Sequence, residues 1–199
     1  MKNTKYVVGI DEVGRGPLAG PVSVCAFRMK ISEYAYISFH AHIRDSKKLS
    51  EKKRNEYFKE LQQLKKEGKC DFAVVSQSAK IIDTKGITYA IRESLKRALQ
   101  KVGAQIDDMI LLDGGLRAEA KFTNQKTIIK GDEKELSIAC ASIVAKVTRD
   151  AHMRRMAKRY PDYGFERHVG YGTVLHRERI QIHGFIPLHR RTFCKNIKV

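Results

Sequence analysis

Four carboxylates stand at the ends of strands that the apolar pattern predicts: Asp11, Glu12, Asp113 and Asp132. The first two follow the apolar run of residues 6–10, the third follows residues 109–112, and the fourth comes after residues 127–129. In open α/β sheets the ends of neighbouring strands surround one ligand site, so these side chains can converge on one small volume. Carboxylates within ~4–6 Å of one another repel and raise each other's pKa values, which predicts a cation among them.

The chemistry of such a site is metal-dependent hydrolysis. Oxygen ligands without His or Cys partners select Mg²⁺ or Mn²⁺, and two such ions ~3.5–4 Å apart activate water and stabilise the leaving oxygen of a phosphodiester. Adjacent residues of a strand face opposite sides, so a bulge or the strand end has to redirect Asp11 or Glu12. Taken singly, Asp113 or Asp132 also fits a turn or a helix cap.

The charge of the chain points to a polyanionic partner. Lys and Arg number 39 against 22 Asp and Glu among 199 residues, a net charge of +17. Basic runs at residues 47–48, 52–54 and 154–159 together suggest a surface that follows phosphates, although each run alone fits a solvated helix face. With 42% hydrophobic residues the chain can form the core of one domain, which excludes a disordered basic tail. A basic protein with an acidic metal centre predicts a nuclease.

Neither a membrane span nor a zinc site is predicted. No apolar run approaches roughly 18 residues, and residues 1–5 lead directly into a strand pattern without a secretory signal. We therefore expect a cytoplasmic protein without membrane contact. The cysteines 25, 70, 140 and 194 form no CxxC or CxxH pair, which favours reduced, buried thiols.

The pattern of elements predicts a single α/β domain over residues 1–199, with a five-stranded mixed sheet flanked by helices and a helical C-terminal segment. Strands are expected at residues 6–10, 22–27, 72–76, 109–112 and 127–129, the first of them central and able to pair antiparallel with the second. Helices are expected at about 50–67, where Ser50 is the N-cap, at 87–102 and at 137–159. Residues 29–44 fit either a strand or a surface loop.

The C-terminal segment, residues about 161–199, is rich in Gly, His and Arg and is predicted to bind substrate. Its histidines at positions 168, 176, 183 and 189 are expected at the surface or at helix ends rather than as metal ligands. Tyr171 lies between two glycines, a poor place for a core residue and a suitable one for stacking on a sugar or base.

Long motifs surround the acids. Residues 9–22, GIDEVGRGPLAGPV, closely resemble the start of bacterial ribonuclease HII, and the likeness continues through residues 45–50, 112–114, 130–132, 137–150 and 168–173. The resemblance implies an RNase H-like fold. It also implies metal-dependent cleavage of the RNA strand of RNA–DNA hybrids and cleavage on the 5′ side of single ribonucleotides embedded in duplex DNA, which leaves 3′-OH and 5′-phosphate ends.

The resemblance also assigns residues. It implies that Mn²⁺ or Mg²⁺ is held by the four acids already named, that Gly14, Arg15 and Gly16 recognise the ribose, and that Tyr171 senses the RNA–DNA junction. Phosphate contacts are expected from two basic side chains of the matching motifs, Lys47 and Lys146. Asp150, beside Arg149, is interpreted as a member of a structural ion pair or as a group that supports the metal ligands, rather than as the fourth metal ligand. Gly115 stands where the family commonly has Asn.

Two other classes remain open. A non-catalytic RNA-binding protein would fit the charge but has no need of acids at strand ends. A different nuclease of the same fold, a Holliday-junction resolvase or ribonuclease HIII, would fit the acids, although ribonuclease HIII usually carries an extra N-terminal domain and five residues precede residue 6 here. We expect the protein to act as a monomer on RNA–DNA hybrids and ribonucleotide-containing duplex DNA.

Overall fold

One mixed sheet of five strands runs in the order β3-β2-β1-β4-β5. The computed structural model describes residues 6–38 and 49–199, and the strands are β1 (Tyr6–Val13), β2 (Val22–Lys30), β3 (Cys70–Gln77), β4 (Met109–Asp113) and β5 (Gln125–Ile128). β1 lies at the centre, antiparallel to β2 and parallel to β4. The predicted mixed sheet, its central strand and its antiparallel pair are therefore confirmed.

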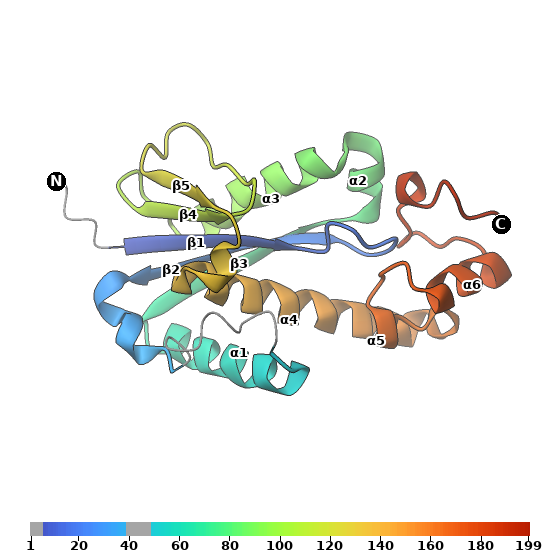
Figure 1. Ribbon diagram of the computed structural model, residues 1–199, viewed down its shortest axis with the longest axis horizontal. Helices are drawn as coiled ribbons and strands as arrows, with labels where there is room; N and C mark the ends of the chain where they lie inside the picture. The colour runs from blue at the N-terminus through green and yellow to red at the C-terminus, as the bar shows by residue number, and fades with distance from the viewer. Residues whose placement is uncertain (1–5, 39–48) are drawn as a thin grey trace.

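Helices cover both faces of the sheet (Figure 1). One face packs against α2 (Ala79–Lys85) and α3 (Ile87–Lys101), and the other against α1 (Glu51–Lys66) and α4 (Leu136–Arg159). The apolar side chains of β2 alternate between these two layers, as the period of a strand requires: Val24 and Ala26 face α3, and Cys25 and Phe27 face α4. The rest of the chain adds short helices: η1 (Ile31–Tyr36), η3 (Gly131–Glu133), η4 (Pro161–Tyr163), α5 (Phe165–His168), α6 (Val174–His183) and η5 (Arg191–Phe193).

The start of α1 follows the predicted capping rule. The Ser50 hydroxyl accepts a hydrogen bond from the backbone N–H of Lys53, and Tyr57, Leu61 and Leu64 are buried on one side of the helix. All four cysteines are free and buried, as predicted.

The helix α4 packs closely on β1 at Gly9. A Cβ added at Gly9 would lie 2.1 Å from the backbone carbonyl of Ser137, so a larger residue there would force the first turn of α4 away from the strand. Glycine is needed at this position for the approach of the helix. The contact places the next turn of α4, which carries Ser142, above the C-terminal half of β1.

Several boundaries differ from the prediction. β1 continues three residues past its apolar run to Val13, and β2 continues to Lys30, followed by the short helix η1. The helix α2 was not predicted, because its seven residues leave too few turns for a periodic pattern. Residues 39–44, part of the segment without an assigned structure, lie outside the described residues. No helix of the described parts of the chain is long and apolar enough to span a bilayer.

The C-terminal segment forms a small core of its own beyond the end of the sheet (Figure 1). Phe165 and Ile180 are fully buried there, together with Met153 from the end of α4 and Ala19 from the loop between β1 and β2. The segment is therefore packed onto α4 and the β1–β2 loop, which fixes its position relative to the sheet.

Candidate active site

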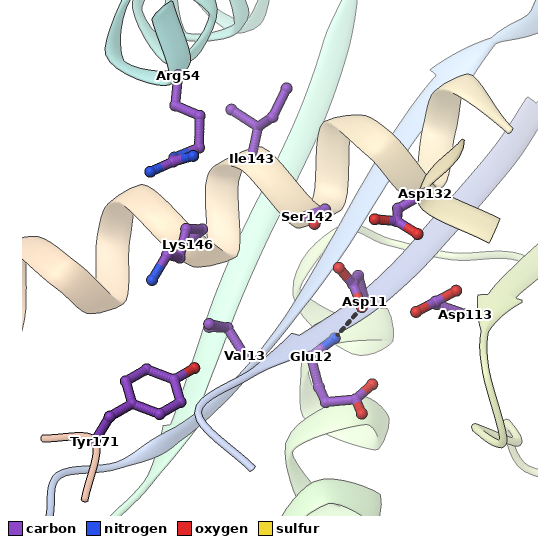
Figure 2. A pocket seen from close by; sticks show the side chains of 10 residues that line it. All are labelled: Asp11, Glu12, Val13, Arg54, Asp113, Asp132, Ser142, Ile143, Lys146 and Tyr171. Carbon is purple, nitrogen blue, oxygen red and sulfur yellow. Dashed lines mark hydrogen bonds between the residues drawn. The ribbon is translucent and has the colours of Figure 1, made fainter. Parts of the chain in front are cut away.

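A pocket of about 370 Å³ opens where β1 passes the end of β4, and all four predicted acids line it (Figure 2). Its other walls come from α1, α4 and the C-terminal segment, through Arg54, Lys146 and Tyr171. The structure thus brings together residues from six separate parts of the chain: β1, α1, β4, η3, α4 and the C-terminal segment. Of the predicted phosphate contacts, Lys146 lies in this pocket and Lys47 lies outside the described residues.

The pairing of β1 explains how two adjacent acids reach one pocket. β1 pairs with β4 only as far as Ile10 opposite Leu112, whereas its pairing with β2 continues to Val13 opposite Ser23. Asp11 and Glu12 therefore lie inside the strand rather than after it, which corrects the prediction, and their register with β2 is regular. The prediction was that a bulge or the strand end would bring the second acid into the site. The structure has no bulge here; instead, the pairing of β1 with β4 ends before Asp11, and beyond that point Glu12 reaches the pocket from the face of β1 opposite to that of Asp11.

The other two acids meet at the far side of the pocket. Asp113 is the last residue of β4, and its Oδ1 accepts a hydrogen bond of 2.6 Å from the backbone N–H of Gly131. Asp132 is buried in the short helix η3 between β5 and α4, not at the end of β5 as predicted. Figure 2 shows the carboxylates of Asp11, Asp113 and Asp132 pointing toward one common space.

The electrostatics of the pocket disfavour negative charge. Burial raises the pKa of the Asp11 carboxyl to about 8, and the charges on Asp113 and Glu12 add to the rise, while the Ser142 hydroxyl partly offsets it. Burial also raises the pKa of Glu12, against the lowering effect of Arg15. Ionised carboxylates in such a place require a compensating cation.

The donor set fits a hard divalent cation. The pocket offers carboxylate oxygens from four side chains and lacks His and Cys, which is the composition that Mg²⁺ and Mn²⁺ prefer. Within the described residues, no three His, Cys, Asp or Glu side chains already have the arrangement of a formed metal site. Asp11, Glu12, Asp113 and Asp132 are the residues that would hold the ions.

The basic and aromatic walls face the acids across the pocket. Lys146 donates to Asp150 one turn further along α4, with Nζ 3.0 Å from Oδ2, so the predicted ion pair of Asp150 is confirmed and its partner is Lys146. The same Nζ lies 5.8 Å from the centre of the Tyr171 ring, and this tyrosine is 40% exposed. Both side chains are therefore placed to touch an anionic ligand that enters the pocket.

Two polar lining residues were not singled out from the sequence. Ser142 lies on the face of α4 that packs on β1, where a small polar residue gives no signal of its own. Arg54 belongs to one of the predicted basic runs, but only the packing of α1 against α4 brings it to the pocket.

The Gly14–Gly16 loop flanks the acids without lining their pocket. The Arg15 Nη1 lies 3.2 Å from the Glu12 Oε1, and Gly16 is exposed with open space around it. Gly14 has a φ of +84°, and a Cβ there would lie 2.3 Å from the Arg149 Nε, so this position requires glycine.

A fully buried arginine fixes this loop. Arg190, in the C-terminal segment, is 0% exposed and donates three hydrogen bonds to backbone carbonyls: 2.6 Å to Gly14, 3.0 Å to Arg15 and 3.0 Å to Gly20. Burial lowers its pKa to about 10, which leaves it charged at neutral pH. The position of the Gly14–Gly16 loop thus depends on a side chain some 175 residues away in sequence.

A second buried arginine joins the later part of the β1–β2 loop, which continues from Gly14–Gly16, to the residues directly before Tyr171. Arg149 on α4 is 1% exposed and donates to the carbonyls of Pro21 at 3.0 Å and Ala19 at 3.3 Å, and also to Val169 at 3.0 Å. The backbone N–H groups of Leu18 and Ala19 in turn donate to the carbonyl of Gly170. The glycine loop and the tyrosine are therefore held as one unit.

Three histidines of the C-terminal segment lie in its core, which corrects the prediction of surface positions, although His168 is the last residue of α5 and so lies at a helix end as the other alternative predicted. His168 and His176 stack with ring centres 4.3 Å apart, and the Nε2 atoms of His176 and His189 are 3.2 Å apart. The Nδ1 of His176 lies 2.9 Å from the Tyr171 carbonyl. Burial lowers the pKa of His176 to about 4 and that of His189 to about 3. Only His183 is exposed as predicted.

This histidine cluster predicts loss of stability in acid. The unfolded chain binds protons at its histidines as the pH falls through ~6.5, whereas the folded chain keeps His176 and His189 neutral until about pH 4 and 3. Their contribution to stability is complete above pH 6.5 and is lost progressively below it. Urea unfolding at pH 7.5, 6 and 5 should show the decline. His189→Gln should flatten it and His183→Gln should not; equal pH dependence in both variants would contradict the role of the buried pair.

The chain is similar to known proteins over nearly its whole length. A model of the family described as Ribonuclease HII matches residues 8–196. The chain is 44% identical over 193 residues to a ribonuclease HII of Clostridium perfringens (97% of this chain, 68% of the relative), and 45% identical over 188 residues to one of Endomicrobium trichonymphae (94% and 84%).

Solved structures show the same fold. The crystal structure of the ribonuclease H2 from Pyrococcus horikoshii OT3 superposes with a TM-score of 0.76 and 24% identity, covering 96% of each chain. The family match favours the nuclease interpretation over a non-catalytic RNA-binding protein, and ribonuclease HII over the other nucleases of this fold. The chain therefore belongs to the ribonuclease HII family of RNase H-type hydrolases.

Proposed function

We propose that this chain is an endoribonuclease that cuts the RNA strand of RNA–DNA hybrids and the 5′ side of single ribonucleotides embedded in duplex DNA. The reaction is a phosphodiester hydrolysis with two divalent ions, Mn²⁺ or Mg²⁺, and leaves 3′-OH and 5′-phosphate ends. The observation that carries the proposal is the convergence of four carboxylates with Lys146 and Tyr171 in one pocket, in a chain of the ribonuclease HII family.

The acidic and basic walls have complementary tasks in this reaction. When bound, the divalent ions supply an activated water and stabilise the leaving oxygen. Asp11, Glu12, Asp113 and Asp132 hold the ions, and the ionised form of these acids is favoured once the ions are present. Lys146, tied to Asp150, and Arg54 orient the phosphate through hydrogen bonds that carry no sequence information.

The Gly14–Gly16 loop and Tyr171 together recognise the ribose. Gly16 has open space where a side chain would otherwise stand, so backbone groups of the loop can approach a 2′-hydroxyl. That hydroxyl is the feature by which a protein distinguishes RNA from DNA. The exposed Tyr171 ring can stack on the neighbouring sugar.

The decisive experiment uses two end-labelled duplexes, one with a continuous RNA strand and one with a single ribonucleotide in DNA. In Mn²⁺ or Mg²⁺ the protein should cut both, and mapping the ends of the second should place the cut 5′ of the ribonucleotide with a 3′-OH and a 5′-phosphate. An all-DNA duplex of the same sequence is the control. The proposal would be refuted if the protein cut neither ribonucleotide-containing duplex in Mn²⁺ and neither in Mg²⁺.

Tyr171→Ala should impair the two substrates unequally. Only the single-ribonucleotide duplex has a deoxyribose on the 3′ side of the ribonucleotide, and stacking of one aromatic ring is worth ~1–3 kcal/mol. We expect kcat/KM on that duplex to fall about 10-fold more than kcat/KM on the continuous hybrid. Tyr160→Ala, which removes a tyrosine outside the pocket, is the control. Equal losses on both duplexes would argue against junction sensing by Tyr171.

A further inference from the structure

A second cavity lies beside the acidic pocket, on the α3 side of β1. It has a volume of about 200 Å³, an apolar floor that includes Leu95 and Leu116, and a rim that carries Arg15, Arg92 and Arg117. The acidic pocket and this cavity are neighbours, because Glu12 lines the first and its ion-pair partner Arg15 lines the second. The function proposed above uses the loop that carries Arg15 but assigns no role to the cavity or to Arg92 and Arg117.

Two of the rim arginines have no acidic partner in the described parts of the chain. No carboxylate of these parts forms an ion pair with Arg92 or Arg117, although an acid stands within two residues of each in sequence. Those acids pair elsewhere: Glu93 with Arg97, at 2.6 Å, and Glu119 with Lys96 and Lys121, at 3.6 and 3.2 Å. The local pairing thus leaves positive charge facing the cavity.

The mouth of the cavity is open on the side of the acids. Gly115, two residues after Asp113, lines it, and a Cβ added there would meet no atom within 4 Å. The backbone of Gly115 does not adopt a positive φ, so the position accepts a side chain without strain. An extended ligand can pass from the acidic pocket to the arginines over this glycine.

We propose that this cavity binds a phosphodiester of the cleaved strand, next to the one held in the acidic pocket. Guanidinium groups present a rigid fork of donors that matches phosphate oxygens, and the apolar floor suits the sugar between two phosphates. The neighbouring phosphate belongs to the same strand, because successive charges of one strand are separated by ~3.4 Å of helix axis, whereas the other strand lies across a groove ~6–12 Å wide. The inference rests on the proposed function, since it names a further contact of the same substrate.

The test couples the removal of an arginine to the removal of one phosphate charge. Single-ribonucleotide duplexes are made with one neutral methylphosphonate at a time, on either strand, and their binding is measured by fluorescence anisotropy in EDTA, where no turnover occurs. Arg92→Ala and Arg117→Ala are each expected to weaken binding of the unmodified duplex about 3- to 10-fold and to lower the slope of log K against log salt by about 1. The matched control is Arg97→Ala on the same helix, whose side chain pairs with Glu93.

The location of the effect decides the inference. For the wild-type protein, a methylphosphonate at one or two positions beside the scissile phosphate of the cleaved strand should weaken binding. At those positions only, the methylphosphonate should not change the binding of the Arg92→Ala and Arg117→Ala variants. The inference is wrong if these variants keep the wild-type sensitivity at every position, if Arg97→Ala matches them, or if the coupled phosphate lies on the complementary strand. Cleavage by the wild-type protein is measured in parallel, so failure of the proposed function would be seen separately.

A second variant leaves the arginines in place. Gly115→Glu adds a carboxylate at the open mouth of the cavity, within reach of the rim arginines. It should weaken binding in EDTA at least as much as Arg92→Ala, with a thermal midpoint close to that of the wild type. Unchanged binding of Gly115→Glu would also count against the cavity as a phosphate site.

Discussion

Asp11→Asn, Asp113→Asn and Asp132→Asn are each expected to lower turnover by more than about 100-fold. Loss of a partner that only supports a metal ligand typically costs ~10–100-fold, and these three side chains would be ligands themselves. The amide keeps the size of the carboxylate and an oxygen acceptor, so Asp113→Asn retains its bond from Gly131. The measurement is kcat/KM on a continuous RNA–DNA hybrid at fixed Mn²⁺ and salt.

Binding and stability separate this loss from misfolding. The variants should bind the hybrid in EDTA about as well as the wild type, because the acids contribute no attraction to a phosphate without metal. Asp162→Asn, an exposed acid outside the pocket, is the matched control and should keep full activity. Near-wild-type turnover of Asp113→Asn would remove Asp113 from the proposed metal site.

The expected stability of Asp11→Asn follows from its pKa. The folded pKa of Asp11 lies at about 8, far above the unfolded value, so the metal-free protein loses stability as the pH rises toward 8. Asparagine has no proton to lose, and the metal-free variant should therefore be the more stable protein at pH 8.5 and lose its advantage at pH 5. Thermal unfolding in EDTA at these two pH values measures the difference. An equal advantage at both pH values would contradict this interpretation of the Asp11 charge.

The acidic site was predictable because its signal is local. The runs before Asp11 and Asp113 are short, apolar and bounded by Gly-rich turns, which is the pattern of a buried parallel strand. Asp132 was placed correctly near the site but in the wrong element. β5 is short and half-exposed, so its pattern does not show where the strand ends and the helical turn of η3 begins.

The buried polar groups around the site were not predictable in the same way. Arginine and histidine usually lie at the surface, and composition alone assigned the C-terminal segment to binding. Arg190 reaches carbonyls 170 or more residues away, the rings of His168 and His176 stack on each other, and both meet the Phe165 ring edge to face. Contacts of this kind depend on the packing of distant segments, and no local periodicity records them.

The largest structural effect is expected from Arg190→Ala. The substitution removes three charge-assisted hydrogen bonds and leaves the carbonyls of Gly14, Arg15 and Gly20 without this donor, at a cost of ~1–3 kcal/mol for each group that stays buried and unpaired. We expect the free energy of unfolding to fall by more than about 3 kcal/mol. The measurement is urea unfolding at pH 7.5, where the histidines beside this segment are neutral.

Two further variants show whether Arg190 positions the glycine loop or only fills space. Arg190→Lys keeps the charge, but one ammonium group cannot donate to all three carbonyls that the planar guanidinium reaches. It should therefore recover only part of the stability and little of the discrimination between ribo- and deoxyribonucleotides. Arg191→Ala, at the exposed neighbouring position where the guanidinium covers the Phe185 ring, should cost less than about 1 kcal/mol and leave cleavage unchanged. If Arg190→Lys were less stable yet cut the single-ribonucleotide duplex as selectively as the wild type, the contacts to Gly14 and Arg15 would serve stability alone. A selective loss on that duplex, measured at a temperature where the variant is fully folded, would show that the buried arginine sets the position from which the loop recognises the ribose.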